Sequence, residues 1–290
     1  MKKIKIVTDS NSGITQEEGK NLDVYVIPMP FTIDGKEYLE EISISQHKFF
    51  ELLEQGADVT TSQPSQSYLE NLWNDLLNEY DQIIYIPMSS GLSATCENAK
   101  KYAEQFDGRV LVADNQRISV PQKISVYEAT QLVKDGKSAE EILQHLENTK
   151  GKYSIYLTVS VLKYLKKGGR ITPAAATLGD MFHLKPILSS RGQSFDKFSV
   201  ALSLNQAKKK MIQQIKSELK GEFKNEYEQG KMALLVAYSK IKDEAVKFSK
   251  EIEIEFPNMK VLYVDPLSLS VACHTGAGAL GMGICICNYL

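Results

Sequence analysis

A short run of mainly apolar residues, Gln82–Ile86, does most to limit the folds open to this chain. Its β-branched and aromatic residues occupy successive rather than alternate positions, which is typical of a parallel strand buried on both faces. The run stops at Pro87 and is followed by Ser89-Ser90-Gly91 and by a helical pattern over residues 92–106. The order of strand, polar turn and helix predicts an α/β fold.

The polar turn after this strand also predicts a binding function. The hydroxyls of Ser90, Ser93 and Thr95 fall where the strand leads into the helix. At a helix N-terminus, unpaired N–H groups and the positive end of the helix dipole favour an anion. We therefore expect this turn to hold a small anionic group, and a carboxylate fits best.

The same alternation of strands and helices continues along the chain and suggests two domains with a seam at Lys150-Gly151-Lys152. Residues 1–151 are expected to form a three-layer α/β/α domain with a mainly parallel sheet. Residues 152–290 are expected to form a second α/β domain with a mixed sheet, and its last helix, about 275–289, is placed at the domain interface. The strands expected first in each domain are Lys2–Thr8 and Tyr153–Val159.

Composition excludes several classes of protein. The formal net charge is −2 and the basic residues are spread out, so a nucleic-acid-binding face is not expected. The start, Met1-Lys2-Lys3-Ile4, leads directly into an alternating strand without a signal sequence, which predicts a cytoplasmic protein. The four cysteines lack the spacing of zinc ligands and the four histidines are scattered, so buried thiols and no metal or other cofactor are expected.

The end of the chain, Val271–Leu290, has no formally charged side chain, and a membrane tail is one reading of it. His274, Thr275, Asn288 and several glycines favour a buried helix instead. The string G-x-G-x-x-G from Gly276 does not predict a dinucleotide site, because that fingerprint follows the first strand of a β-α-β unit. The glycines are expected to let a helix begin close to another backbone or to a ligand.

A serine hydrolase is an alternative reading of the same residues. Gly91–Thr95 matches four of the five positions of the G-x-S-x-G nucleophile elbow, and Ser93, Asp265 and His274 have the chain order of a hydrolase triad. Thr95 stands where the elbow needs a small residue, and no H-G-G-type oxyanion loop is visible. The binding function is therefore preferred.

Six short motifs together resemble the DegV family, bacterial proteins that include the fatty-acid-binding subunit of fatty acid kinase. They follow the family order over almost the whole chain. The motifs are Thr8-Asp9-Ser10, Thr61-Ser62-Gln63-Pro64-Ser65, Ser89-Ser90-Gly91-Leu92-Ser93, Leu165-Lys166-Lys167-Gly168-Gly169-Arg170-Ile171, Lys185-Pro186-Ile187-Leu188 and His274-x-Gly276-x-Gly278.

The resemblance implies a two-domain α/β protein that buries one long-chain fatty acid, such as palmitate or oleate, between its domains. It implies that Thr61, Ser93 and His274 hold the carboxylate, with Ser62 and Arg170 near the same site. It also implies a role in phospholipid metabolism, in which a separate ATP-dependent kinase subunit makes the acyl-phosphate and this chain is not the catalyst.

A third hypothesis concerns the basic residues Lys166, Lys167 and Arg170, which could make transient contact with an anionic membrane surface or an acidic partner. Basic residues also suit the last turn of a helix, where they interact favourably with the helix dipole. A solvated helix end is therefore the preferred explanation of these residues.

Overall fold

The computed structural model describes residues 2–178 and 184–289. The chain divides into two compact units. The first contains Met1–Gly151 and Ser268–Ser270, and the second contains Lys152–Leu267 and Val271–Leu290. The short segment Ser268–Ser270 thus belongs to the first unit, although the chain on both sides of it belongs to the second.

The first unit contains a parallel sheet of four strands. These are β1 (Ile4–Asp9), β2 (Val24–Ile27), β6 (Gln82–Ile86) and β7 (Val110–Val112), in the order β2-β1-β6-β7. Ile6 pairs with Val24 on one side and with Ile84 on the other. All residues of β6 are buried, as the continuous apolar pattern of Gln82–Ile86 predicted. The residues of β1 are also all buried, although the sequence there alternates between polar and apolar residues.

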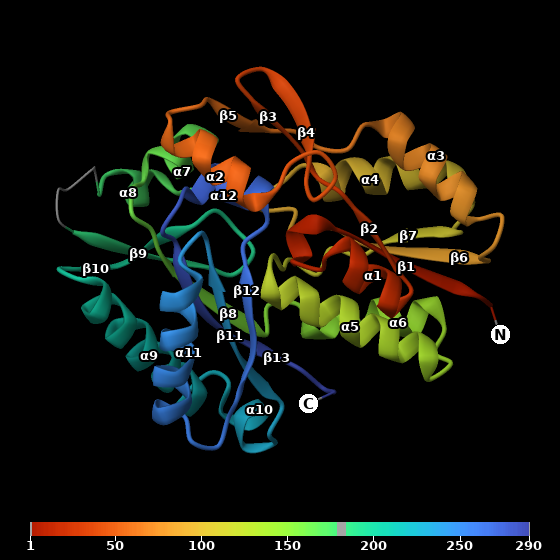
Figure 1. Ribbon diagram of the computed structural model, residues 1–290. Coiled ribbons are helices and arrows are strands. Elements are labelled where there is room, and N and C mark those ends of the chain that lie inside the picture. Colours follow the sequence, from red (N-terminus) through yellow and green to blue (C-terminus); the bar gives the residue numbers. More distant parts are fainter. Residues whose placement is uncertain (1, 179–183, 290) are drawn as a thin grey trace. The chain divides into compact units, whose positions relative to one another are not determined.

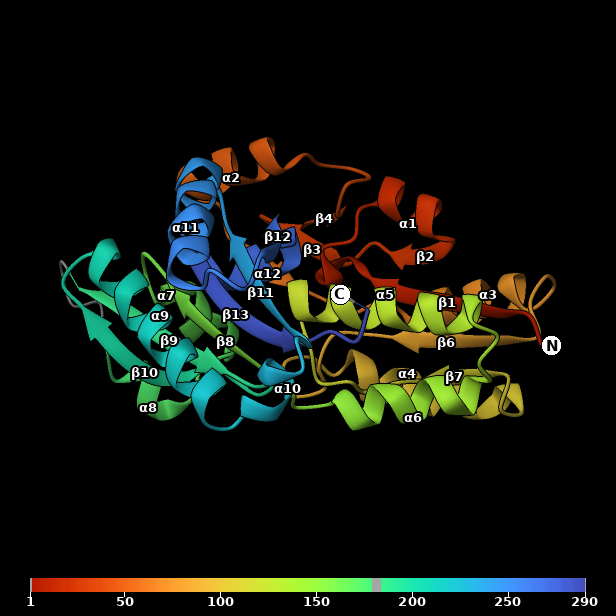
Figure 2. The ribbon, with the colours of Figure 1, turned by 90° about the horizontal axis from the view of Figure 1, so that it is seen from below.

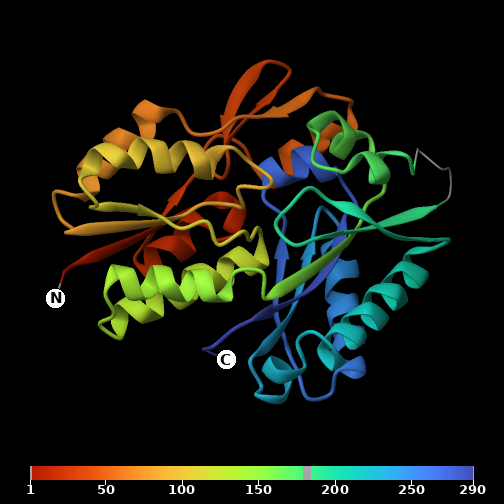
Figure 3. The ribbon, with the colours of Figure 1, turned by 180° about the vertical axis from the view of Figure 1, so that it is seen from behind.

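Helices cover both faces of this parallel sheet (Figures 1 and 3). On one face, Trp73 and its neighbours pack against Ile83 and Tyr85. On the other, Val126 and Ile142 pack against Ile84. The first face carries α3 (Gln66–Leu76) and α4 (Thr95–Ala103, extended by η2, Glu104–Phe106), and the second carries α1 (Gln16–Leu22), α5 (Val120–Lys134) and α6 (Ala139–Thr149).

A small antiparallel sheet is formed by the segment of the chain between β2 and β6. Its strands are β3 (Pro30–Ile33), β4 (Lys36–Leu39) and β5 (Val59–Thr61), in the order β4-β3-β5. Asp34 and Gly35, which connect β3 and β4, both have the positive φ that a two-residue hairpin turn requires. Helix α2 (Gln46–Glu54) is capped by the side chain of Ser45, and its Phe49 ring meets Phe31 edge to face.

Buried polar groups occupy the turn after β1, where a short 3-10 helix, η1 (Ser10–Ser12), begins. The carboxylate of Asp9 is inaccessible to solvent and accepts hydrogen bonds from the N–H groups of Met88 (2.9 Å) and Asn11 (3.1 Å). The side-chain amide of Gln122 donates a third at 3.2 Å. Burial raises the pKa of Asp9 to about 6, although these hydrogen bonds act in the opposite direction.

A second buried carboxylate, Glu40, lies in the same polar cluster. The hydroxyl of Ser10 donates to it at 2.7 Å, and the N–H of Leu269 donates to its other oxygen. Burial raises the pKa of Glu40 to about 7. The side-chain oxygen of Asn11 accepts hydrogen bonds from the hydroxyls of Ser268 (3.0 Å) and Ser270.

The second unit contains a mixed sheet of six strands, in the order β10-β9-β8-β13-β11-β12. The pair β11–β12 is parallel and the other pairs are antiparallel. With the parallel sheet of the first unit, this confirms the predicted α/β fold class. The strands are β8 (Tyr153–Thr158), β9 (Lys185–Ser190), β10 (Asp196–Ala201), β11 (Met232–Tyr238), β12 (Val261–Pro266) and β13 (Leu280–Ile286).

Two long helices, α9 (Leu204–Lys220) and α11 (Lys242–Glu255), cover one face of the mixed sheet (Figure 2). Met211 of α9 and Phe248 of α11 share a core with Leu234 and Ile284 of the central strands. The remaining helices are short. They are α7 (Lys163–Gly168), α8 (Pro173–Ala176), α10 (Lys224–Glu228) and α12 (Leu269–Thr275).

The prediction of a last helix over residues 275–289 is wrong. Helix α12 ends at Thr275, and β13 follows it as an inner strand that pairs with β8 and with β11. All seven residues of β13 are buried, so the absence of charge reflects burial on both faces of a sheet and not a helix. Gly283 suits this position, because a Cβ there would lie 2.8 Å from the carbonyl oxygen of Ser154 on β8.

Two other expectations differ in extent. Helix α4 begins at Thr95 and not at Leu92, so Ser93 precedes the helix. The sequence also predicts a short helix over residues 174–182. It starts as α8, but residues 179–183 lie outside the described part of the chain.

Within residues 2–178 and 184–289, no helix combines the length and apolar character needed to cross a membrane. The uncharged C-terminal segment, for which a membrane tail was one reading, is divided between α12 and β13.

The raised pKa of Glu40 predicts a specific dependence of stability on pH. Because the folded protein keeps this proton up to about pH 7 and an unfolded chain only to about 4.5, this group lowers the free energy of unfolding as pH rises between these values. The shift corresponds to about 3 kcal/mol. We expect Glu40→Gln to gain about this much relative to wild type between about pH 4.5 and 8.

The free energy of unfolding at each pH is measured by urea unfolding, followed by the fluorescence of Trp73. This residue is the only tryptophan of the sequence, and its ring is fully buried in the first unit. Glu140→Gln is the control, since hydrogen bonding at the helix start lowers the pKa of that exposed carboxyl. In Glu140→Gln, the free energy of unfolding should still fall above pH 5, as it does in wild type. A constant difference between Glu40→Gln and wild type over this range would contradict the prediction.

Candidate functional site

The turn that carries Ser93 is built on the buried Ser89. The carbonyl oxygen of Ser89 accepts hydrogen bonds from the N–H groups of Leu92 and Ser93, both at 3.1 Å. The Ser89 hydroxyl accepts the N–H of Gly91 at 3.2 Å. Ser90 is tied down separately, because its hydroxyl donates to Asp114 at 2.7 Å. The backbone around Ser93 is therefore fixed before any ligand arrives.

The Ser93 hydroxyl lies at the start of α4. It is 2.9 Å from the hydroxyl of Thr95 and accepts the Thr95 N–H at 3.2 Å. Ala94, the residue at the N-cap position, supplies no side-chain hydrogen bond. Ser93 is half-buried, so this pair of hydroxyls can direct a donor towards an anion beside the helix start.

The segment Thr61–Ser65 is held close to the same helix. Thr61 ends β5, where it pairs with Phe31, and is half-buried. Two residues later, the side-chain oxygen of Gln63 accepts a hydrogen bond from the amide of Asn98 in α4 at 2.8 Å. Ser62 is exposed, and its N–H donates to the carbonyl of Pro30. The structure thus links the two predicted serine and threonine motifs within the first unit.

In the second unit, His274 lies against the end of α7. A Cβ on Gly168 would fall 2.0 Å from Nδ1 of His274, so only glycine leaves room for the ring. The next residue, Gly169, ends α7 with φ +65°, the left-handed geometry that favours glycine after a helix. Gly168 therefore leaves room for the His274 ring, and Gly169 allows the backbone to end the helix.

His274 is neutral at physiological pH. Burial lowers its pKa to about 4, and the positive charge of Arg170 acts in the same direction. A neutral imidazole offers one N–H donor and one acceptor. The guanidinium of Arg170 donates to the carbonyl oxygen of Gly168, and this contact braces the loop that packs against the His274 ring.

The glycines after His274 make a turn and do not start a helix. Gly276 and Gly278 have φ of +71° and +82°, and a Cβ at either would collide with Tyr164 or Ser160. Ser239, at the end of β11, holds this turn: its hydroxyl donates to the carbonyl of Gly276, and its carbonyl accepts the N–H of Gly278 at 2.9 Å. The glycines are thus required by backbone geometry and close packing.

The predicted site residues fall into two groups. Thr61, Ser62 and Ser93 belong to the first unit, and Arg170 and His274 belong to the second. Sequence reasoning missed the contact of Gly168 with His274, for which the paired glycines were the available signal. It also missed the role of Ser239 in holding the glycine turn, for which the sequence contains no signal.

The geometry around Ser93 differs from a nucleophile elbow. In that motif the serine sits on a sharp, strained turn between a strand and a helix. Here β6 ends at Ile86 and α4 begins at Thr95, so a longer turn separates them, and the Ser93 hydroxyl is engaged by Thr95. Asp265, the third residue of the alternative triad, lies on β12.

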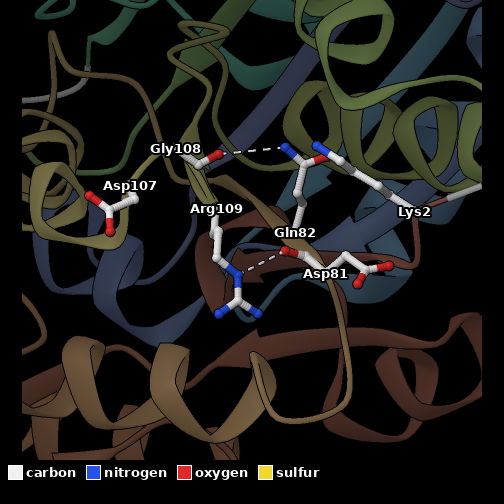
Figure 4. Close-up of a pocket in the computed structure, with 6 residues that line it drawn as sticks. All are labelled: Lys2, Asp81, Gln82, Asp107, Gly108 and Arg109. Carbon is white, nitrogen blue, oxygen red and sulfur yellow. Dashed lines mark hydrogen bonds between the residues drawn. The ribbon is translucent and has the colours of Figure 1, made fainter.

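A cavity of about 530 Å³ in the first unit lies at the opposite ends of the strands (Figure 4). Its lining includes Gln82, the first residue of β6, and Arg109, which precedes β7. Arg109 is occupied by backbone carbonyls, with donors 2.9 Å from Leu77 and 3.2 Å from Asp81. This cavity is therefore not the candidate site.

Comparison with known proteins agrees with the motifs. A model of the DegV family, described as uncharacterised proteins, matches residues 3–286. A DegV domain-containing protein of Staphylococcus aureus (strain N315) is 30% identical over 284 residues, which are 97% of this chain and 98% of the relative.

Two solved structures share the fold. DegV of Bacillus subtilis, described as a fatty acid binding protein, matches with a TM-score of 0.85 at 27% identity, over 99% of this chain and 100% of that one. A DegV family protein of Thermus thermophilus, described for fatty acid binding, matches with a TM-score of 0.86 at 28% identity, over 98% and 99%. Since the family match spans nearly the whole sequence, the chain belongs to the DegV family.

Proposed function

We propose that this protein binds a long-chain fatty acid and that Thr61, Ser93 and His274 supply hydrogen bonds to its carboxylate. The observation that carries the proposal is the likeness to the DegV proteins of Bacillus subtilis and Thermus thermophilus, both described for fatty acid binding, over almost the whole chain. The prearranged hydroxyl of Ser93 and the neutral ring of His274 support it. Ser62 and Arg170 are assigned supporting positions near these groups.

The energetics are consistent with such a ligand. Removing about 14 to 16 methylene groups from water gains roughly 0.8 kcal/mol each, or about 12 kcal/mol in total. Ordering the acyl chain and the protein returns much of this gain. A carboxylate buried without partners would cost several kcal/mol more, so hydroxyl and imidazole donors are needed.

The proposal extends to a non-catalytic role. A protein that holds the carboxylate with neutral donors can present it to a separate ATP-dependent kinase subunit, which would form the acyl-phosphate. The engagement of Ser93 with Thr95 favours this binding role over a hydrolase with Ser93 as nucleophile.

The test of ligand class is native mass spectrometry of the purified protein, followed by solvent extraction. We expect an added mass of roughly 250–285 Da, the range of an acid with the chain length considered above, that extracts as a fatty acid. Protein that is bare and also takes up neither palmitate nor oleate would contradict the function. Labelling of Ser93 by a fluorophosphonate probe would instead support the hydrolase.

Removing either proposed donor should weaken binding without unfolding the protein. We expect Ser93→Ala or His274→Ala to cost about 1–3 kcal/mol in palmitate affinity, because each leaves a buried polar group without a partner. Titration calorimetry measures this. The matched control is Ser138→Ala, which removes the hydroxyl that caps α6 and is not among the proposed ligand contacts. Unchanged affinity in a folded Ser93→Ala, His274→Ala double variant would exclude the proposed site.

The two adjacent glycines allow a sharper test of the His274 position. Gly168→Ala should displace the ring and weaken palmitate binding about tenfold, equivalent to about 1.4 kcal/mol, because the new Cβ occupies the place of Nδ1. Gly169→Ala should cost about 1 kcal/mol of stability through its positive φ but leave affinity nearly unchanged, since a Cβ there meets no atom within 4 Å. Equal losses of affinity in both variants would show that the ring contact is unimportant.

A further inference from the structure

The Thr8-Asp9-Ser10 motif has no place among the proposed ligand contacts, yet it is among the most buried polar segments of the protein. Thr8 and Asp9 are inaccessible to solvent, and Ser10 is 7% exposed. Their side chains are used for contacts within the first unit. The Thr8 hydroxyl donates to the carbonyl of Ile86 at 2.8 Å, at the end of β6.

One side of this cluster fixes the turn that carries Ser93. Asp9 accepts the N–H of Met88, the residue immediately before Ser89. Ser89 in turn accepts the N–H groups of Leu92 and Ser93. The start of the turn is therefore held by the carboxyl group of Asp9, which is the last residue of β1.

The other side fixes the first turn of α12. Asn11 accepts the hydroxyls of Ser268 and Ser270, and Glu40 accepts the N–H of Leu269, the first residue of the helix. Ser10 joins the two parts, because its hydroxyl donates to Glu40 and accepts the N–H of Met29. All of these groups belong to the first unit.

His274 lies five residues after Leu269 in the same helix. A helix is stiff over so short a length, with a rise of about 1.5 Å per residue. Any shift or fraying of the first turn of α12 therefore changes the place of His274. At Val271 the chain passes into the second unit. Ser268–Ser270, which Asn11 and Glu40 hold, are therefore the last residues of the first unit before His274.

We propose that Asn11 and Glu40 form a latch on Ser268–Ser270 that positions α12 and thereby sets the affinity of His274 for a carboxylate ligand. The latch residues are positioning residues and do not touch the ligand. This inference rests on the proposed function, since it assigns the turn after β1 a role in the same site. It gives Asp9 and Ser10 of the motif a role, because Asp9 accepts the N–H of Asn11 and Ser10 donates to Glu40.

The test compares Glu40→Ala, Glu40→Gln and Asn11→Ala with wild type by palmitate titration and by hydrogen–deuterium exchange. Glu40→Ala and Asn11→Ala should each weaken palmitate binding about tenfold and speed exchange in residues 270–276, while α6 exchanges as before. Glu40→Gln should keep the palmitate affinity and the slow exchange of wild type, because the amide oxygen of the new side chain can still accept the Leu269 N–H. Glu128→Ala is the control, since it removes another carboxylate of the first unit that is only 1% exposed and bonds to His145.

A double-variant cycle separates positioning of His274 from general destabilisation. If the latch acts through His274, Glu40→Ala should have almost no further effect on affinity in a His274→Ala background. Full additivity of the two losses, or exchange in α12 that is unchanged in Glu40→Ala, would overturn the proposal. So would a loss of affinity in Glu128→Ala as large as that in Glu40→Ala.

The exchange measurement needs no ligand, so the two proposals can fail separately. If wild type binds neither palmitate nor oleate, the proposed function fails. The latch itself is then supported by faster exchange of α12 in Glu40→Ala and refuted by unchanged exchange.

Discussion

The burial of two carboxylates, Asp9 and Glu40, constrains much of the first unit. A buried carboxyl group is costly unless hydrogen bonds enclose it, so the chain around it must present donors from defined positions. Met88, Gln122 and Leu269 do so from three separate segments. These bonds fix the turn after β6 and the start of α12, which are also the segments that carry Ser93 and His274. The cost of burial appears in the raised pKa of each group.

Local patterns predicted much of this fold because they act over a few residues. The residues of β6 were identified by their continuous apolar character. Serines at positions 45, 65 and 138 likewise act locally, because each side chain caps the helix that follows it. The C-terminal segment failed for a related reason. An inner strand buried on both faces has no alternation, and over residues 280–286 it cannot be told from a buried helix by periodicity. Only its pairing with β8 and β11 decides the matter.

The sequence proposes residues for the binding site but not the contacts around them. Thr61, Ser93 and His274 are proposed from the motifs that resemble the DegV family, in which hydroxyls and an imidazole stand beside turns and helix ends. No sequence rule, however, brings Gly168 to the ring of His274 or Gln63 to Asn98. These contacts join segments 35 to 106 positions apart, and they depend on the packing of whole elements. The same limit hid the partnership of Glu40 with Leu269, whose backbone N–H carries no sequence signal.

The neutrality of His274 gives the proposed binding site a particular character. An imidazolium would form an ion pair with a carboxylate, and charged hydrogen bonds are roughly twice as strong as neutral ones. In the protein without ligand, burial keeps the imidazole unprotonated down to about pH 4, and the positive charge of Arg170 acts in the same direction. The ring then contributes one neutral N–H donor, comparable with a serine hydroxyl. Specific but moderate contacts of this kind suit a protein whose proposed role is to hold a carboxylate and present it to a separate enzyme.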